Sequence, residues 1–297
     1  GNASEVFGTG SSAKTLALSL GSAAVPATGT AVAIPATKGL VIQNNSLSSL
    51  NARATASNWS IAGTTLSFDA LVNYASANDQ LGVQGSATFT QSSLGTLNVQ
   101  MGTMPAGSDA GVVGLMLSGG QVSSLDMTLN SNITTGGLTF NTTGLNFVYA
   151  AQSSTFTLTG ASSFSFNSQN VGVTFGGSDS YFGSAPTAGL VITNGNLSSV
   201  DMIVTSSISV GSLSFRADHL RFTRNLQNSN NVFTMTGATG FSAGGLGSVS
   251  ATFGTAAANG NPGTTGLVIT NGSLTSLDMS LNSNISVDSV GFSTNGL

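Results

Sequence analysis

The sequence has no cysteine and unusually little charge. Charged residues make up 5% of its 297 positions, against roughly a quarter in an ordinary soluble domain, and only six residues are lysine or arginine. Without cysteine the chain can form neither disulfides nor thiolate metal sites. With a net charge of -4 it also lacks the positive potential that nucleic-acid binding needs, so we expect no nucleic-acid partner.

Long apolar runs are missing as well. No stretch of about 18 apolar residues occurs, which predicts that the chain has no transmembrane helix. Residues 14–33 faintly resemble a signal peptide, but Gly21, Pro26 and Gly29 interrupt any apolar core of the usual length, about 7 to 15 residues. We therefore interpret this segment as mature structure, and the missing cysteines are consistent with a large exported protein.

Small polar residues and a regular apolar set fill the chain instead. Glycine, serine, threonine and asparagine occupy most non-apolar positions, while valine, isoleucine, leucine and 16 phenylalanines recur among them. Disordered chains rich in glycine and serine lack such an apolar set. We therefore expect this chain to fold.

The strongest signal is an internal repeat. The segment Gly189-Leu-Val-Ile-Thr-Asn-Gly-Asn-Leu-Ser-Ser-Val200 has counterparts that begin at Gly39, Gly114 and Gly266, at spacings of 75, 75 and 77 residues. This regularity indicates duplication of one unit with five strand-like pieces, named A to E. We expect a partial repeat at 1–38 (the end of strand D, strand E and a loop), whole repeats at 39–113, 114–188 and 189–265, and a partial repeat at 266–297.

The third copy shows the five pieces best. Strand A, at 190–193, is followed at once by a pair typical of a type I′ hairpin turn. Strand B, at 197–210, alternates with period two. Strands C, D and E are expected at 213–222, 233–235 and 249–253, with loops between C and D at 225–231 in this copy and 150–154 in the second. The turn pairs of the four copies are Asn44-Asn45, Gly119-Gly120, Asn194-Gly195 and Asn271-Gly272.

These patterns predict an all-β fold. No segment shows about ten residues of helical periodicity, and β-branched residues and phenylalanine dominate the apolar positions. We expect tandem repeats of about 75 residues whose antiparallel strands and hairpins form an elongated sheet array, with five strands advancing each repeat by roughly 24 Å. The alternative is a β-solenoid with about three rungs of some 25 residues per repeat, because Asn/Gly corners suit that fold too.

Both ends of the sequence fall inside a repeat. Val6-Phe7 resembles the end of strand D and residues 15–20 resemble strand E, while Gly296-Leu297 matches Gly144-Leu145 inside strand C. We therefore expect either an excerpt from a longer array or a subunit whose open strands a neighbour completes. In both cases the expected product is a filament or a long stalk.

The chemistry-bearing residues form no recognisable active site. His219, the only histidine, lies in segment 215–224 with three of the six basic residues, so an anion or carbohydrate contact competes with a solvated face of strand C. One histidine without cysteine leaves no Cys/His pair and no zinc site, and no G-x-S-x-G elbow accompanies the many serines. We predict no enzymatic activity, no catalytic, cofactor-binding or metal-binding residues, and no cofactor.

An aspartate recurs in strand B. Asp126, Asp201 and Asp278 lie twelve residues after the leading glycine of their copies, where the first copy has Asn51. A calcium site would need several oxygens around one ion, and copies separated by five strands, with no D-x-D-x-D run, do not provide them. We expect these carboxylates on the polar face of strand B, where they favour solubility and correct register.

Trp59, the only tryptophan, falls in a few extra residues of the first copy's strand B. Core filling or a bulge is one interpretation, and a stacking platform for carbohydrate is the other. Asn-x-Ser/Thr sequons are weak predictors of glycosylation in a chain so rich in these residues. They occur at Asn2, Asn44, Asn58, Asn132, Asn141, Asn196, Asn271 and Asn284.

The repeat, read as Gly266-Leu-Val-Ile-Thr-Asn-Gly-Ser-Leu-Thr-Ser-Leu-Asp-Met279, resembles the tandem β repeats of very large secreted bacterial surface and matrix proteins. The resemblance covers nearly the whole chain in style and period, and it implies an extracellular or cell-surface role without catalytic residues. We therefore expect a self-associating structural segment of a filament, matrix or surface stalk. The alternatives are an adhesin that binds carbohydrate or a cell surface, and a lipid-conducting trough with an unfilled apolar groove.

Overall fold

The protein is an all-β molecule, as its sequence predicts. The computed structural model describes residues 1–7, 14–75, 80–106, 109, 111–119, 121–183, 185–226, 231–243, 247–254, 265–283, 285–287, 290–292 and 294. Besides strands, these residues form two single-turn 3-10 helices, η2 (Ala151–Ser153) and η3 (Ser180–Phe182). None of the described helices is long and apolar enough to span a bilayer.

The chain forms two compact units, each assembled from several stretches of sequence. Unit 1 comprises Gly1–Asn132, Thr142–Thr157 and Ile192–Asn196, whereas unit 2 comprises Ile133–Asn141, Leu158–Val191 and Leu197–Leu297. The compact units therefore do not follow the repeat boundaries. Strands with residues in both units are β13 (Thr155–Phe166), β15 (Gly189–Thr193) and β16 (Asn196–Val204).

The other strands belong to one unit each, and the pairings found among the described residues are antiparallel. Unit 1 holds β1 (Asn2–Phe7), β2 (Lys14–Leu20), β3 (Gly39–Gln43), β4 (Ser46–Ile61), β5 (Thr64–Ala75), β6 (Gln80–Gln91), β7 (Gly95–Met101), β8 (Leu115–Ser118), β9 (Gln121–Leu129) and β12 (Asn146–Ala150). Unit 2 holds β10 (Ile133–Thr135), β11 (Leu138–Phe140), β14 (Gln169–Phe175), β17 (Ile208–Val210), β18 (Leu213–Phe215), β19 (His219–Asn225), β20 (Val232–Ala243), β21 (Gly247–Phe253), β22 (Leu267–Thr270), β23 (Ser273–Leu277), β24 (Met279–Leu281), β25 (Ile285–Val287) and β26 (Val290–Phe292).

Each of the long strands β6 and β20 divides one of its edges between two partner strands. The second half of β6 pairs with β7, whereas its first half, Gln80–Val83, pairs with β8. β20 is divided in the same way between β21 and β22. The division falls at Gly85 and Gly237, whose φ values of +145° and +119° are rare for residues with a side chain.

Strands E and A therefore occupy the same position in the order of strands across the sheet, one beyond the end of the other. The distance that each repeat adds to the sheet is consequently shorter than the sequence predicts. In unit 1, β7 and β8 both pair with β6 on one side and with β9 on the other. In unit 2, β21 and β22 both pair with β20, and their other neighbours are β24 and β23. Five strands thus occupy four levels, which corresponds to roughly 19 Å rather than the roughly 24 Å expected.

Strands B and C of the third copy are interrupted, although the sequence predicts them as continuous. β16 and β17 form the expected strand B, and β18 and β19 form the expected strand C. β17 and β18 make a separate short hairpin, whose second strand pairs with β20. In the first copy β4 and β5 run unbroken, with one register shift between Ala56 and Trp59. Alternation does not reveal the break because both pieces keep a period of two.

The predicted Asn/Gly turns have the backbone that a type I′ turn requires. In three copies φ is positive at both central residues. In the second copy Gly120 lies outside the described residues, as do residues 227–230 of the expected loop between strands C and D. The second copy's loop at 150–154 contains η2. The three described pairs are Asn44-Asn45, Asn194-Gly195 and Asn271-Gly272.

Each unit closes through two turns that touch backbone to backbone. In unit 1, a Cβ on Gly63, in the β4–β5 turn, would lie 2.8 Å from the Asn194 carbonyl oxygen in the β15–β16 turn. In unit 2, a Cβ on Gly137, in the β10–β11 turn, would lie 2.4 Å from the Asn271 carbonyl carbon in the β22–β23 turn. Glycine is required for such an approach. The sheet of each unit is therefore curled, so that turns two repeats apart meet.

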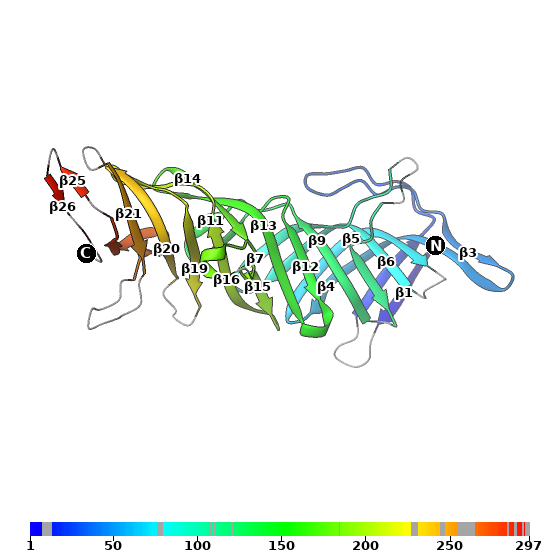
Figure 1. Ribbon diagram of the computed structural model, residues 1–297. Helices are drawn as coiled ribbons and strands as arrows, with labels where there is room; N and C mark the ends of the chain where they lie inside the picture. Colours follow the sequence, from blue (N-terminus) through cyan, green and yellow to red (C-terminus); the bar gives the residue numbers. More distant parts are fainter. Residues whose placement is uncertain are drawn as a thin grey trace. The chain divides into compact units, whose positions relative to one another are not determined.

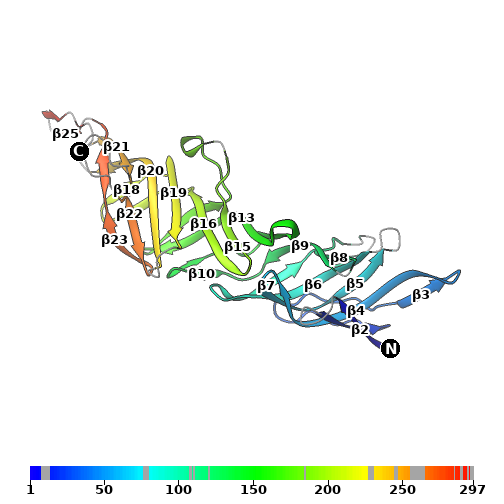
Figure 2. The ribbon, with the colours of Figure 1, turned by 90° about the horizontal axis from the view of Figure 1, so that it is seen from below.

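Phenylalanines fill the inside of each curled sheet. In unit 1, the ring centroids of Phe89 and Phe156 are 4.9 Å apart. In unit 2, Phe222 stacks on Phe164 and on Phe233 at 5.2 and 4.8 Å. All five rings are buried, and Figure 2 shows the strands β13, β19 and β20, which carry Phe164, Phe222 and Phe233. The apolar face of the alternating strands is thus the interior of each unit.

Candidate assembly edge and surface clusters

The hairpin of β3 and β4 is built like two other hairpins of the chain. β3 pairs with β4, β8 with β9 and β22 with β23 in the same register, and each of β3, β8 and β22 has a leucine directly after the leading glycine of its copy. The three hairpins can therefore be compared residue by residue. Their common register shift lies between Val41 and Ile42, Met116 and Leu117, and Val268 and Ile269.

β3 differs from its counterparts because its apolar side chains are uncovered. Leu40 and Ile42 are 48% and 64% exposed, whereas Leu115 and Leu117 at the same positions of β8 are 0% and 4% exposed. The corresponding side chains of β15 and β22 are buried as well. β6 and β20 give β8 and β22 a second neighbour, whereas among the described residues β3 pairs with β4 alone. Figure 1 shows β3 projecting at the end of unit 1.

The free edge of β3 is also uncharged. Gly39–Gln43 contains no acidic or basic residue, and the first charge next to it in the sequence is Lys38. Unpaired N–H and C=O groups along such an edge pair readily with another strand. Burial of the adjacent apolar stripe adds a hydrophobic contribution to that pairing. The edge therefore has the chemistry of a strand-addition site.

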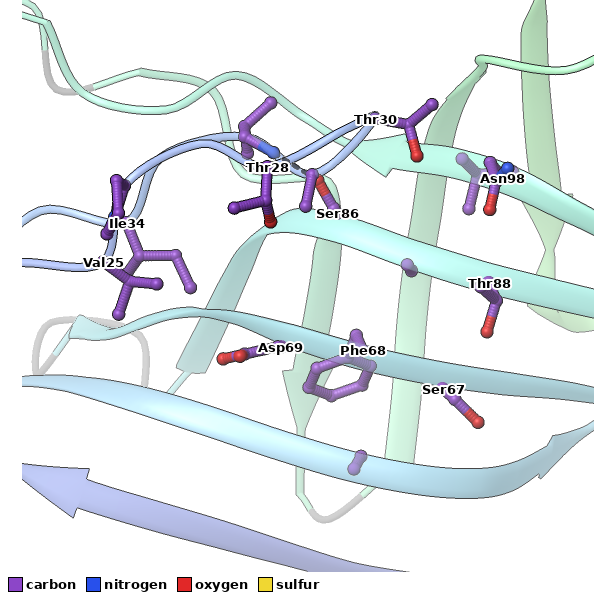
Figure 3. A pocket seen from close by; sticks show the side chains of 16 residues that line it. Val25, Thr28, Thr30, Ile34, Ser67, Phe68, Asp69, Ser86, Thr88 and Asn98 are labelled. Carbon is purple, nitrogen blue, oxygen red and sulfur yellow. Dashed lines mark hydrogen bonds between the residues drawn. The ribbon is translucent and has the colours of Figure 1, made fainter.

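A second candidate site is a cavity in unit 1, beneath an arm formed by residues 21–38. The arm folds back on itself through an antiparallel bridge between Val25 and Ile34. Its Val32 backbone N–H donates to Ser86 Oγ at 2.8 Å, which holds the arm against the sheet. Figure 3 shows the arm passing over the strands, and the space between them is a cavity of about 370 Å³.

The sheet side of this cavity is polar. Ser67, Thr88 and Asn98 line it with hydroxyl and amide groups, and the carboxylate of Asp69 lies beside them. The aromatic ring of Phe68 also contributes to the lining. Neutral donors and acceptors next to an aromatic ring suit a small ligand with several hydroxyl groups.

Two arginine–aspartate pairs link neighbouring strands. Arg53 Nε donates to Asp69 Oδ1 at 2.7 Å and Arg221 Nε donates to Asp201 Oδ1 at 2.8 Å, while Nη2 of each arginine donates to the other carboxylate oxygen. These side-chain hydrogen bonds raise the pKa of Arg53 and of Arg221, although burial opposes the rise. Asp201 is buried, and this bidentate partner provides hydrogen bonds to both oxygens of its carboxylate.

His219 belongs to a small cluster of side chains in unit 2. Its Nδ1 lies 2.9 Å from Asp179 Oδ1, and its ring stacks on Tyr181 with 5.2 Å between the centroids. Asp179 Oδ1 also accepts the backbone N–H of Tyr181 at 2.9 Å and so caps η3. The predicted solvated face is therefore an incomplete description of His219, because the ring has a carboxylate and an aromatic partner.

The basic residues of segment 215–224 do not converge on one anion site. Arg216 pairs with Asp218 at 3.2 Å, and Arg221 forms the cross-strand pair described above. Arg224 donates to a threonine and an asparagine side chain, and burial lowers its pKa. Each arginine thus has partners of its own, and the anion or carbohydrate contact at His219 stays a prediction.

The recurring aspartates of strand B have different surroundings. Asp126 is exposed, and Asp278 is exposed and accepts a hydrogen bond from a threonine hydroxyl at 2.6 Å. Asp201 lies on the face of its strand opposite Met202, as predicted, but there it is buried and bound by Arg221. At the same position of the first copy, Asn51 donates to another asparagine. Within the described part of the chain, no three His, Cys, Asp or Glu side chains come together.

Trp59 is part of the core of unit 1. Its indole is 2% exposed and packs edge-on against Phe68, with 5.3 Å between the ring centroids. Its Nε1 donates to the Thr15 carbonyl oxygen at 2.9 Å, so the polar atom of the indole is satisfied. The interpretation of Trp59 as a carbohydrate platform is therefore wrong, and the core-filling interpretation is confirmed.

The described sequon asparagines lie on the surface. An exposed side chain is a requirement for glycosylation, so modification of these positions stays a prediction. Asn284 lies outside the described residues. The exposed positions are Asn2, Asn44, Asn58, Asn132, Asn141, Asn196 and Asn271.

Sequence reasoning missed both the cavity and the His219 cluster. Asp179 is 40 residues away from His219, in the loop between β14 and β15, so no local motif contains both. The arm at 21–38 has no motif either, and the one available signal is its length, because the corresponding loop at 103–113 of the next copy is shorter. Contacts that depend on how loops fold over a sheet leave little trace in the sequence.

The surroundings of β3 can be compared with those of the same strand in the other copies of the repeat. Comparison of the chain with protein-family models, with curated proteins and with solved structures finds no match. Within the chain, however, β8, β15 and β22 show the same strand type in a covered state. The neighbour that covers β8 and β22 is the first half of the long strand before them, and for β3 that long strand is β1, whose Gly1 pairs with Leu20 as Gly237 pairs with Phe253. The uncovered edge of β3 therefore lies where the sequence starts.

Proposed function

We propose that this protein is a structural segment of an extracellular bacterial filament, matrix or surface stalk, in which tandem β repeats associate by strand addition. The observation that carries the proposal is the repeated pairing pattern, in which the first half of each long strand covers the A-type strand that follows it, as β6 covers β8 and β20 covers β22. A pattern of this kind continues from one repeat to the next by the addition of strands.

The pairing pattern supports the same function. The first half of β6 covers β8, and the first half of β20 covers β22, so one more strand on β3 would continue an arrangement that the chain already contains. The resemblance of the repeat to those of large secreted surface and matrix proteins supports the extracellular part of the proposal. The low charge fits a protein that associates through apolar contacts and backbone hydrogen bonds.

Adhesion to carbohydrate is the second candidate, because of the cavity beneath the arm. Its volume of about 370 Å³ lies in the range of small-ligand pockets, and its lining carries several hydroxyl groups and an amide. Titration of the chain with mono- and disaccharides by calorimetry tests this function, with Asn98→Ala as the variant expected to lose binding. Equal heats for the wild type and the variant would contradict it.

A lipid-conducting trough has less support. That function needs an open apolar groove, whereas the inward side chains of each unit, such as Phe89 and Phe222, are buried against other rings. Extraction of the purified chain followed by lipid mass spectrometry tests it directly.

The structural role is tested by sedimentation velocity and electron microscopy of the purified chain over a range of concentrations. We expect assemblies that grow with concentration. Ile42→Lys places a charge on the open edge and should weaken association at least ~10-fold, because a lysine on an edge strand opposes pairing. Monomers at every concentration, in both measurements, would contradict the proposal.

Val112→Lys is the matched control. Val112 is 62% exposed, close to the value for Ile42, but it lies in the loop between β7 and β8 and not on a free strand edge. The control variant should associate like the wild type. If Val112→Lys and Ile42→Lys weaken association equally, surface charge and not strand addition controls the assembly.

A further inference from the structure

The cavity beneath the arm has a polar side formed by three neighbouring strands. Ser67 of β5 lies opposite Thr88 of β6, and Thr88 lies opposite Asn98 of β7. Directly opposite side chains share one face of a sheet, with about 5 Å between their Cβ atoms. Asp69 and Ser86 form the next row, two residues along the same strands. The cavity therefore faces two rows of hydrogen-bonding groups (Figure 3).

Part of this hydrogen-bonding capacity is unused within the protein. Among the described residues, neither the Thr88 hydroxyl nor the Asn98 side-chain amide has a hydrogen-bond partner. Ser67 Oγ and Ser86 Oγ each accept one backbone N–H at 2.8 Å, so both hydroxyls still have a proton to donate. The polar side thus offers donors and acceptors to a ligand with several hydroxyl groups.

The opposite side of the cavity is apolar and comes from the arm. Val25, Pro26 and Ile34 of the arm line it. Two backbone hydrogen bonds, at 2.8 and 2.9 Å, join Val25 to Ile34 and close the arm into a hairpin. The apolar side is therefore preformed, and a ligand does not have to order the arm when it binds.

The cavity has no cation available for an acidic ligand. Among the described residues that line it, none is lysine, arginine or histidine, and its one carboxylate is that of Asp69. Both oxygens of this carboxylate accept hydrogen bonds from Arg53, which is not part of the lining. An anionic group in the cavity would therefore meet a carboxylate and find no unpaired cation.

From the polar rows, the apolar arm and the lack of a free cation we infer that the cavity binds one neutral sugar ring. A sugar ring carries hydroxyl groups around its rim and C–H groups on its faces. It can direct hydroxyls to Thr88 and Asn98 while its C–H groups pack against Val25 and Pro26. The volume of about 370 Å³, near the lower end of the range for ligand pockets, suits a single ring and not a long oligosaccharide. This inference rests on carbohydrate binding, the second candidate function, and it excludes uronic and sialic acids as ligands.

The test measures binding of the methyl glycosides of glucose, galactose and mannose, and of glucuronic acid, to the full-length chain by calorimetry. We expect at least one neutral glycoside to bind, and glucuronic acid to bind at least ~10-fold more weakly. Thr88→Val removes the hydroxyl, keeps the shape of the side chain, and should weaken binding of the neutral glycoside at least ~10-fold.

Thr90→Val is the matched control. Thr90 lies two residues further along β6, on the same face of the sheet and outside the cavity lining, and its hydroxyl is paired with that of Thr96. This variant should bind the glycoside like the wild type. If Thr88→Val and Thr90→Val weaken binding equally, the sugar does not bind in the cavity and the inference is overturned.

Asp69→Asn tests the selectivity for neutral sugars. The amide leaves Arg53 without its charged acceptor, so the guanidinium becomes available to the carboxylate of an acidic sugar. We expect the affinity for glucuronic acid to rise at least ~10-fold in this variant, relative to that for the neutral glycoside. An unchanged preference would show that the paired carboxylate does not exclude acidic sugars, which overturns the inference.

The outcomes separate this inference from the proposed functions. If glucuronic acid binds the wild type as tightly as the neutral glycosides and Thr88→Val weakens both, the inference is overturned and carbohydrate adhesion stands. If no sugar binds, carbohydrate adhesion fails together with the inference. The structural role is unaffected in both cases, because sedimentation and microscopy test it without a sugar.

Discussion

At the scale of single residues, glycine determines where distant turns can meet. Gly63 and Gly195 touch in unit 1, and Gly137 and Gly272 touch in unit 2, each with a positive φ. A side chain on any of these residues would meet backbone atoms of the opposite turn. The backbone cannot give way as a flexible side chain can, so these contacts tolerate only glycine.

Gly63→Ala should therefore destabilise the chain more than its dihedral angles explain. Gly95 is a suitable control, because its φ of +75° matches the +76° of Gly63 and an added Cβ would meet nothing within 4 Å. We expect Gly95→Ala to cost about 1 kcal/mol and Gly63→Ala about 3 kcal/mol. Urea unfolding followed by Trp59 fluorescence measures both. Equal losses would show that the two turns do not press on each other.

At the scale of elements, one repeat position serves different roles because its neighbours differ. Asp126 and Asp201 occupy equivalent places in β9 and β16, yet only Asp201 faces an arginine, which β19 supplies. β12, the strand beside β9, places Val148 opposite Asp126 and offers it no charge. The cross-strand neighbour thus decides whether the aspartate is buried and paired or exposed.

Asp201→Asn and Asp126→Asn form a matched pair of variants. We expect the first to lower the free energy of unfolding by about 1–3 kcal/mol, because it leaves Arg221 without its charged acceptor. The second should change it by less than about 0.5 kcal/mol, since Asp126 is exposed. Urea unfolding of both variants beside the wild type measures the difference. A similar loss for both would mean that the pair with Arg221 contributes nothing.

The raised pKa of Arg221 determines how this ion pair contributes to folding stability as the pH changes. Hydrogen bonding to Asp201 raises the pKa of Arg221, so the contribution to stability is complete below the pKa of the unfolded chain and is lost only as the pH rises through the higher folded value. Arginine therefore adds no pH dependence between about pH 6 and 9.

At the scale of the whole molecule, the low charge determines how association should respond to salt. With 5% charged residues, association depends on apolar contacts and backbone hydrogen bonds, which sodium chloride screens little. Sulfate, which is excluded from protein surfaces, strengthens such contacts.

We therefore expect the sedimentation profile of the chain to change less than about twofold in apparent association constant between about 50 and 500 mM sodium chloride. Ammonium sulfate at equal ionic strength should increase association. A large weakening by sodium chloride would indicate that the few ion pairs, and not the β3 edge, hold the copies together.

Much of the secondary structure could be predicted from local sequence. Period-two alternation and the Asn/Gly pairs indicate strands and turns because both act through neighbouring residues of one chain segment. The repeat spacing likewise places β6, β13 and β20 at matching positions. The assignment of Trp59 remained open, because an indole can fill a core or lie on a surface without any change in the residues beside it.

The sequence by itself determined the all-β class, the antiparallel hairpins and the equivalence of β3, β8 and β22 along the chain. Only the tertiary structure decided that strands E and A share one level, that Asp179 reaches His219, and that Leu40 and Ile42 lie open to solvent. The physical reason is that alternation specifies which face of a strand is apolar. Whether that face is covered depends on a neighbouring strand that comes from elsewhere in the chain, or from another repeat.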